Sequence, residues 1–196
     1  MKNLPPVILA SKSPRRQHLL KLMDIDFKVV LKEVDESYPS GLSPEEIAVY
    51  ISEKKAKAFD ETIKNEIVIT ADTIVSVDDK ILGKPDNEEH AFDILSQISG
   101  RMHEVITGVT LLKDHRLNSF YDISEVYFRE LKPDEIRHYI QTSKPFDKAG
   151  AYGIQEWIGL VGIEKIVGSY TNVVGLPTEK LYRELSKYLI THFETF

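Results

Sequence analysis

The sequence predicts a mixed α/β (α+β) fold, built on an elongated, twisted mixed sheet that is flanked by helices. Segments typical of strands alternate along the chain with segments of helical periodicity, as they do in α/β and α+β domains. The 196 residues are 42% hydrophobic and 29% charged, which is ordinary for a globular protein with one substantial core. No repeat, low-complexity tract or long linker divides the chain. We therefore expect a single domain over residues 1–196, with two lobes around a cleft.

Apolar runs predict the strands, and helical periodicity predicts the helices. The predicted strands cover residues 6–10, 27–31, 66–71, 73–77, 103–113, 119–128 and 159–166. The predicted helices cover residues 14–24, 44–60, 87–98, 133–142 and 178–190.

Several element boundaries carry local signals. Ser43 and Glu46 form a capping box around Pro44, which suits the first helical position because proline lacks an N–H. Gly100 follows the helix predicted to end at residue 98 and is a typical stop signal. The acidic pair at residues 78–79 separates two apolar stretches and predicts a hairpin turn.

Composition excludes several classes of function. The chain has no cysteine, so disulfides, thiolate catalysis and zinc–sulfur sites are excluded, and a reducing cytoplasmic location is expected. No apolar run approaches the roughly 18–20 residues of a membrane span, and the N-terminus lacks a signal-peptide pattern. The formal charge of −6 argues against nucleic acid as a partner.

The first strand leads directly into a basic, hydroxyl-rich turn. Residues 7–10 are apolar, and Ser13 and Pro14 then suit the N-cap and the first position of a helix. Free backbone N–H groups, the positive end of the helix dipole and the guanidinium groups of Arg15 and Arg16 converge there. This combination suits a phosphate group. The alternative is a solvated basic turn.

Asp72 stands in the otherwise uncharged run of residues 67–75. A carboxylate in a buried strand is unfavourable unless it meets a metal, a cation or several donors. We favour a role as metal ligand or general base. The alternative is a capping aspartate at a strand end.

Lys55 is expected on the inward face of its helix, because it shares that face with Ala48, Ile51 and Phe59. It either extends to the edge of the core or needs an anionic partner, and a bound phosphate would serve. Lys54 falls on the face that is expected to meet solvent.

Three further segments offer polar groups with weaker signals. Glu36 follows the second predicted strand, where acidic residues are usually solvated but could bind a metal. Lys84 lies in a Gly-Lys-Pro turn that is too short to be a P-loop. Residues 147–155 (DKAGAYGIQ) contain two glycines that allow a ligand to approach the backbone, and Gln155 could read the edge of a base. The alternative for this last segment is a tightly packed loop.

Together these segments resemble the Maf family of nucleoside triphosphate pyrophosphatases, which is named for septum formation. The resemblance covers nearly the whole chain and is carried by Leu9–Arg16, Lys55-Ala56, Ala71–Thr73, Gly83–Pro85, Leu95–His103, Asp147–Gln155 and Val174–Pro177. It implies a Maf/ITPase-like fold around a nucleotide cleft. It also implies hydrolysis between the α and β phosphates to a nucleoside monophosphate and pyrophosphate, with Mg²⁺ or Mn²⁺.

The resemblance also implies roles for individual residues. Catalysis falls to Asp72, as proton acceptor, with Glu36, Lys55 and Lys84, and the metal ligands are Glu36 and Asp72. The implied substrate-binding residues are Ser13, Arg15, Arg16, Thr73 and Gln155.

The subgroup acting on dTTP and UTP resembles this chain best, since its members carry Arg, Thr and Gln where this chain has Arg15, Thr73 and Gln155. The Glu156-Trp157 pair departs from the glycine that many members have after the glutamine. Two alternatives stay open, namely the same reaction on modified or purine nucleotides such as 7-methyl-GTP, and a non-catalytic nucleotide sensor or division-related interaction protein. The expected partner is a small nucleotide, and a homodimer is left open.

Overall fold

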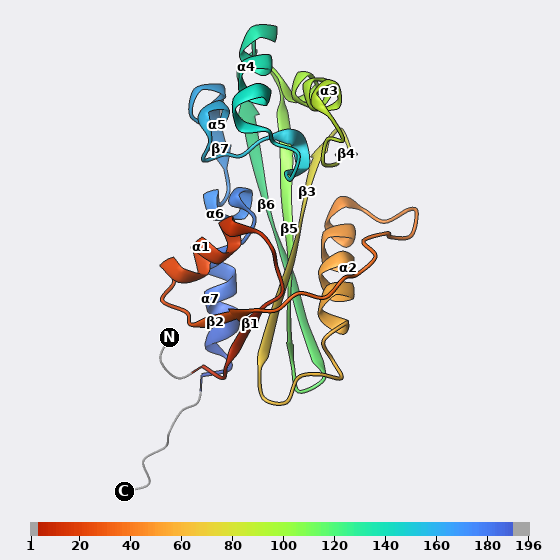
Figure 1. The fold of residues 1–196 in the computed structure, drawn as a ribbon, viewed down its shortest axis with the longest axis vertical. Coiled ribbons are helices and arrows are strands. Elements are labelled where there is room, and N and C mark those ends of the chain that lie inside the picture. Colours follow the sequence, from red (N-terminus) through yellow and green to blue (C-terminus); the bar gives the residue numbers. More distant parts are fainter. Residues whose placement is uncertain (1–3, 190–196) are drawn as a thin grey trace, which may run out of the picture.

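The computed structural model describes residues 4–189 as a mixed seven-stranded sheet with helices on both faces (Figure 1). The strand order is β2-β1-β3-β5-β6-β7, and β4 pairs with β3. β1 runs parallel to both of its neighbours, and the remaining pairs are antiparallel. The strands are β1 (Val7–Leu9), β2 (Phe27–Val29), β3 (Ile67–Val77), β4 (Lys80–Leu82), β5 (Met102–Lys113), β6 (Arg116–Phe128) and β7 (Ile163–Val167). The predicted mixed sheet is confirmed.

Helices gather at both ends of the long strands β3, β5 and β6 (Figure 1). The helices are α1 (Pro14–Leu22), α2 (Pro44–Lys57), α3 (Glu88–Ile98), α4 (Pro133–Ser143), α5 (Trp157–Gly162), α6 (Tyr170–Val174) and α7 (Thr178–Ser186), with a short 3-10 turn at Ala149–Ala151. One apolar core joins α3 and α4 to one end of the strands, and another joins α1 and α7 to the other end. These two cores correspond to the two predicted lobes.

Side chains of β3 alternate between the two faces of the sheet, as a strand requires. Ile67 and Ile69 pack into the core formed with α1 and α7. Val68 and Ile74 pack on the opposite face, in the smaller cores under α2 and the turn that follows it. Because Asp72 lies between Val68 and Ile74 in the same alternation, its side chain emerges on the face that α2 covers.

One edge of β3 is unpaired at its centre. β1 pairs with β3 only as far as Ile69, and β4 pairs with it only from Val75 onward. Among the described residues, the intervening stretch therefore has a strand partner, β5, on one side only. Side chains from both faces can reach this open edge, and Asp72 and Thr73 lie within it.

Gly108 allows α2 to lie against the sheet beside this opening. It pairs with Asp72 across β3 and β5. A Cβ at Gly108 would lie 2.4 Å from the backbone carbon and oxygen of Ala48 in α2. The absence of a side chain at this position is therefore a condition for the close approach of the helix.

The strand predictions need four corrections. The strand predicted at 27–31 ends at Val29. Residues 66–71 and 73–77 form the single strand β3, because the Asp72 backbone stays in register with β5. The strand predicted at 119–128 begins at Arg116, since residues 114 and 115 alone make the hairpin turn with positive φ. The strand predicted at 159–166 was wrong over its first half, where α5 precedes β7. Short apolar runs do not separate a helix from a strand by periodicity.

The helix predictions are confirmed in position but differ at their ends. α2 ends at Lys57 rather than residue 60, and α7 ends at Ser186, whereas residue 190 of its predicted range lies outside the described residues. α6 and the 3-10 turn were not predicted. The hairpin turn at residues 78–79 is confirmed, with φ values of 48° and 61°. No helix within residues 4–189 has the length and apolar character needed to cross a membrane.

We predict that Gly108→Ala destabilises the protein by about 1–3 kcal/mol, because the new methyl group displaces the Ala48 backbone and lifts α2 from the sheet. The measurement is the free energy of unfolding in urea. Gly83→Ala is the control, because a Cβ there meets nothing within 4 Å. Equal stability of the two variants would contradict the tight approach of α2.

Candidate active site

A cavity of about 1160 Å³ opens at the unpaired edge of β3. Its wall combines the β1–α1 turn, the loop after β2, the last turns of α2 and residues 147–155. It is lined by all the predicted site residues, namely Ser13, Arg15, Arg16, Glu36, Lys55, Asp72, Thr73, Lys84 and Gln155. Segments far apart in the sequence therefore meet in one cleft.

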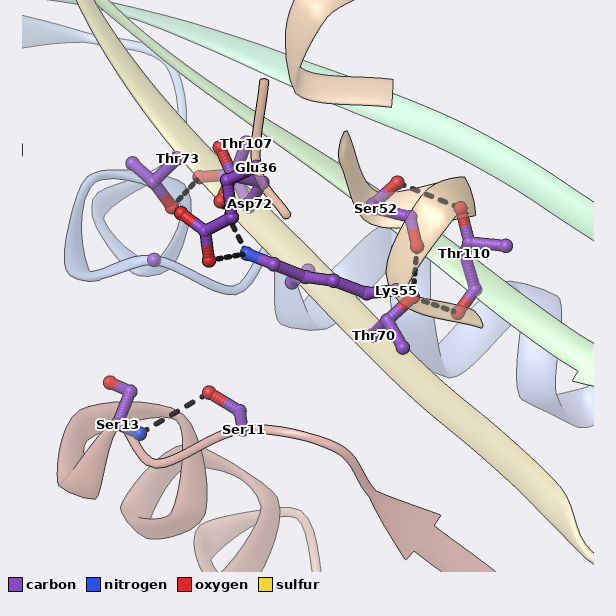
Figure 2. A network of polar contacts seen from close by, with 12 residues as sticks. Ser11, Ser13, Glu36, Ser52, Lys55, Thr70, Asp72, Thr73, Thr107 and Thr110 are labelled. Carbon is purple, nitrogen blue, oxygen red and sulfur yellow. Dashed lines mark hydrogen bonds and ion pairs between the residues drawn. The ribbon is translucent and has the colours of Figure 1, made fainter. Parts of the chain in front are cut away.

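Lys55 joins the two acidic residues of the cleft. Its Nζ lies 2.7 Å from Asp72 Oδ1 and 2.9 Å from Glu36 Oε1 (Figure 2). The side chains of Lys55 and Asp72 are only 18% and 14% exposed, so this pair is poorly screened by water. Burial alone would raise the pKa of Glu36, but the hydrogen bond and charge of Lys55, with the charges of Lys84 and Arg16, lower it below 4.5.

A buried hydroxyl network fixes the part of α2 that carries Lys55. Ser52, one turn before Lys55, donates to the Val49 carbonyl at 2.8 Å, and its hydroxyl lies 2.7 Å from that of Thr110 on β5. Thr70 of β3 donates to the Ser52 carbonyl at 2.7 Å (Figure 2). These bonds tie α2 to the two central strands, so the Lys55 side chain leaves the helix at a fixed point above Asp72.

The loop that carries Glu36 is attached to α2 by two lysines. Lys32 donates to the Ala58 carbonyl at 2.7 Å, beyond the end of the helix. Lys54, on the face predicted to meet solvent, bonds Asp35 Oδ2 at 3.0 Å in an exposed ion pair. Adjacent lysines thus hold adjacent acidic residues, and the Asp35 contact places Glu36 beside Lys55.

Arg16 is occupied largely by contacts within the protein. Its guanidinium donates to the carbonyls of Gly175 and Ala71 at 2.7 and 2.8 Å, to Thr73 Oγ1 at 2.9 Å and to Ser11 Oγ at 3.4 Å. These four bonds use four of its five N–H donors. Burial lowers the pKa of Arg16, although the charge of Asp72 acts in the opposite direction. Arg16 connects α1 to the open edge of β3 and to the turn after α6.

The N-terminus of α1 faces the cavity. Ser13 is the N-cap, with its hydroxyl accepting the Arg16 backbone N–H, and Pro14 occupies the first turn. Arg15 reaches across the cleft to Asp147 Oδ2 at 3.0 Å. The predicted positions of Ser13 as N-cap and Pro14 in the first turn of the helix are therefore confirmed.

Lys84 and Gln155 are exposed and line the cleft on the side of the lobe that contains α3 and α4. Neither side chain makes a hydrogen bond or ion pair with another described residue. The carbonyl of Gly83 accepts the Gly150 N–H at 3.2 Å, which ties the Lys84 turn to the segment containing Gln155. Both side chains are therefore free to contact a ligand from a fixed backbone.

Sequence reasoning missed a polar cluster in the wall of the cleft, centred on the largely buried Lys148. Lys148 bonds Asp147 and Glu156, and Glu156 also accepts the hydroxyl of Tyr139. Lys148 belongs to the DKAGAYGIQ segment, and the one local signal of its burial is the run of small residues that follows it, Ala149, Gly150 and Ala151.

The acidic residues of the cleft suit a hard divalent cation. Within residues 4–189, no group of three or more His, Cys, Asp and Glu residues is arranged to hold a metal. Mg²⁺ is commonly bound by one or two carboxylates together with substrate phosphates and water. Glu36 and Asp72, which both bond the Lys55 ammonium, are the carboxylates of the cleft that could join such a set.

We predict that Lys55→Met raises the pKa of Glu36, because burial is then opposed only by the charges of Lys84 and Arg16. Since the folded pKa lies below the unfolded value, the wild-type contact stabilises the protein above about pH 4.5 and is lost as the pH falls through the folded pKa. The measurement is a carboxyl NMR titration. Lys57→Met, whose lysine pairs with Glu53 on the exposed side of α2, is the control. An unchanged pKa in Lys55→Met would exclude Lys55 as the cause.

Comparison with known proteins assigns the chain to a family. A model of the family described as Maf-like protein matches residues 6–188. A protein of Flavobacterium psychrophilum named dTTP/UTP pyrophosphatase is 49% identical over 187 residues, which cover 95% of this chain and 94% of that protein. A protein of the same name from Cytophaga hutchinsonii is 50% identical over 181 residues, 92% of this chain and 83% of that protein. The solved Ham1 protein of Staphylococcus aureus is more distant, with a TM-score of 0.44 and 19% identity over 63% of this chain and 71% of that chain. The chain belongs to the Maf family.

Proposed function

We propose that this protein hydrolyses nucleoside triphosphates, with dTTP and UTP preferred, between the α and β phosphates to a nucleoside monophosphate and pyrophosphate. The observation that carries the proposal is the Glu36–Lys55–Asp72 cluster, which faces the N-terminus of α1 across one cavity. The names of relatives about half identical over nearly the whole chain support the same reaction. A site that only bound anions would gain nothing from two carboxylates, and this argues for an enzyme.

The phosphates are proposed to bind between α1 and the Lys84 turn. The N-terminus of α1 offers the positive end of the helix dipole, and Ser13 and Arg15 lie there. Lys84 provides a cation from the opposite wall, unpaired within the described chain. A triphosphate has a charge near −4, and phosphoryl transfer depends mainly on neutralising and positioning that charge.

Asp72 is proposed to accept a proton from the attacking water. Lys55 keeps the Asp72 carboxylate oriented, and its ammonium also bonds Glu36. Glu36 and Asp72 would hold Mg²⁺ or Mn²⁺, which supplies charge neutralisation and Lewis acidity when bound. Arg16 has a positioning role in this proposal, with one remaining N–H directed to substrate, because its other donors bond the protein.

Base selection is proposed to involve Thr73 and Gln155. Thr73 lines the cleft, with its hydroxyl held by Arg16 and by Thr107 at 3.0 Å. The Gln155 amide is unpaired within the described chain and offers both a donor and an acceptor to a pyrimidine edge. The absence of cysteine and the net charge of −6 fit a cytoplasmic enzyme whose partner is a small nucleotide rather than nucleic acid.

The first test measures pyrophosphate release from a panel of nucleoside triphosphates with Mg²⁺, with Mn²⁺ and with excess EDTA. We expect release from dTTP and UTP with the monophosphate as co-product, and loss of that release in EDTA. Activity confined to purine or methylated nucleotides would overturn the pyrimidine preference while keeping the reaction. Nucleotide binding without any release would favour a sensor instead.

Asp72→Asn is expected to lower kcat by about 10²–10⁴-fold with little change in KM, because the amide keeps the shape of the carboxylate but accepts no proton. Steady-state kinetics with dTTP provide the measurement. Asp114→Asn is the matched control, since Asp114 lies in the exposed β5–β6 turn at φ 49°, a conformation that asparagine also adopts. Near-normal turnover of Asp72→Asn would refute the proton-acceptor role.

A further inference from the structure

A buried lysine connects the two ends of the segment at residues 147–156. Only 9% of the Lys148 side chain is exposed, and its Nζ lies 2.7 Å from Asp147 Oδ1 and 3.1 Å from Glu156 Oε1. A buried charge is unfavourable unless it is paired and hydrogen-bonded. Lys148 can therefore keep its place only while both carboxylates keep theirs.

Glu156 is itself fixed to the neighbouring helix. Its second oxygen accepts the hydroxyl of Tyr139, a fully buried residue of α4, and the same Tyr139 oxygen accepts the Gly153 N–H at 3.1 Å. Burial and the contact with Glu156 both raise the pKa of Tyr139, so its hydroxyl stays protonated and continues to donate. A chain of contacts thus runs from Tyr139 of α4 through Glu156 to Lys148.

The backbone between the two anchored ends is also closely packed. A Cβ at Gly153 would lie 2.7 Å from the carboxyl carbon of Glu156, so the glutamate folds over this glycine. Gly150 adopts a φ of 69° against the side chain of Val75. The segment therefore has little freedom to change shape while its ends remain fixed.

Each anchoring residue directly follows or precedes a residue that faces the cleft. Asp147 comes immediately before Lys148 and pairs with Arg15 of α1 at 3.0 Å. Gln155 comes immediately before Glu156 and lines the cavity with an unpaired amide. The Lys148–Glu156 contact therefore sets the separation between the partner of Arg15 and the amide of Gln155.

We infer that Lys148 and Glu156 are positioning residues for nucleotide selection, holding Asp147 against Arg15 and holding Gln155 at the base end of the cleft. The inference rests on the proposed function, because it assigns the held residues to recognition of the same nucleotide. Lys148 also lines the cavity, but its ammonium is occupied by Asp147 and Glu156, so Lys148 and Glu156 act through these neighbours. Their loss should change recognition while leaving the Lys55–Asp72 pair intact.

The test compares Lys148→Met and Glu156→Gln with the wild type, using dTTP, UTP and dCTP as substrates. We expect kcat/KM for dTTP to fall by about ten- to a hundredfold, mainly through KM, because a displacement of about 1 Å in a positioned group has effects of this size. The preference for dTTP over dCTP should fall by about tenfold. Lys148→Arg keeps the charge, so it should retain a substantial part of the kcat/KM for dTTP and of the preference for dTTP that Lys148→Met loses.

Trp157 supplies a readout that does not depend on activity. It is the only tryptophan of the chain, directly follows Glu156 and packs edge-on against His138 with ring centroids 5.0 Å apart. Acrylamide quenching of its fluorescence, without nucleotide, should increase in Lys148→Met and Glu156→Gln. Lys187→Met, which removes an exposed lysine paired with Glu184 on α7, is the matched control and should leave quenching and kinetics unchanged.

The outcomes separate this inference from the proposed function. Absence of pyrophosphate release by the wild type would refute the proposed function, and the quenching comparison would then decide alone whether the contact orders the segment. Unchanged quenching in both variants overturns the inference. An equal loss of activity on all three nucleotides, with no change in preference, also overturns it, because that pattern indicates only a general structural role.

Discussion

The site depends on one ammonium group placed between two carboxylates at an unpaired strand edge. Lys55 comes from a helix, Asp72 from the centre of a strand and Glu36 from a loop, and their contacts are 2.7 and 2.9 Å long. A carboxylate at the position of Asp72 would be strongly unfavourable in a fully paired strand. The gap between β1 and β4 gives it access to the cleft, and Lys55 compensates its charge. Removing one partner of a buried ion pair typically costs about 3–5 kcal/mol, so the arrangement is as much a structural requirement as a functional one.

The packing of α2 follows from this requirement. Gly108 lets the helix approach the sheet at Ala48, and the hydroxyl groups of Ser52, Thr70 and Thr110 bond across the interface one turn before Lys55. A lysine has a long, flexible side chain whose ordering is entropically unfavourable. Fixing its Cα close to Asp72 limits that cost to the side chain itself.

Residue patterns predicted most of the fold, and residue patterns together with the family resemblance predicted the residues that line the cleft. Strong local signals indicate structure directly. The Ser43 capping box marks the start of a helix, and the charge of Asp72 in an apolar run marks a carboxylate that needs a partner. The short helix α5 was missed because its apolar run fits a strand equally well. The contacts of Arg16 could not be predicted, because its partners lie on other elements, with Gly175 159 residues away. The partners of Lys148 are close in sequence, but the bond that ties Glu156 to Tyr139 of α4 depends on the packing of that helix. Long-range pairing of charges depends on topology, which local pattern does not specify.

The charges of the cleft also determine where the phosphates of a nucleotide would bind. Arg15 and Lys55 are already paired with carboxylates, whereas Lys12 and Lys84 have no ion-pair partner among the described residues. Two unit charges 4 Å apart interact by about 1–4 kcal/mol between bulk water and a protein surface, so unpaired cations attract phosphates that the carboxylates repel. Phosphates would therefore settle first against the free lysines and the N-terminus of α1. Glu36 and Asp72 would then face the α-phosphate, where the proposed reaction needs a proton acceptor. A divalent cation shared with the nucleotide would there offset the repulsion between the carboxylates and the phosphate.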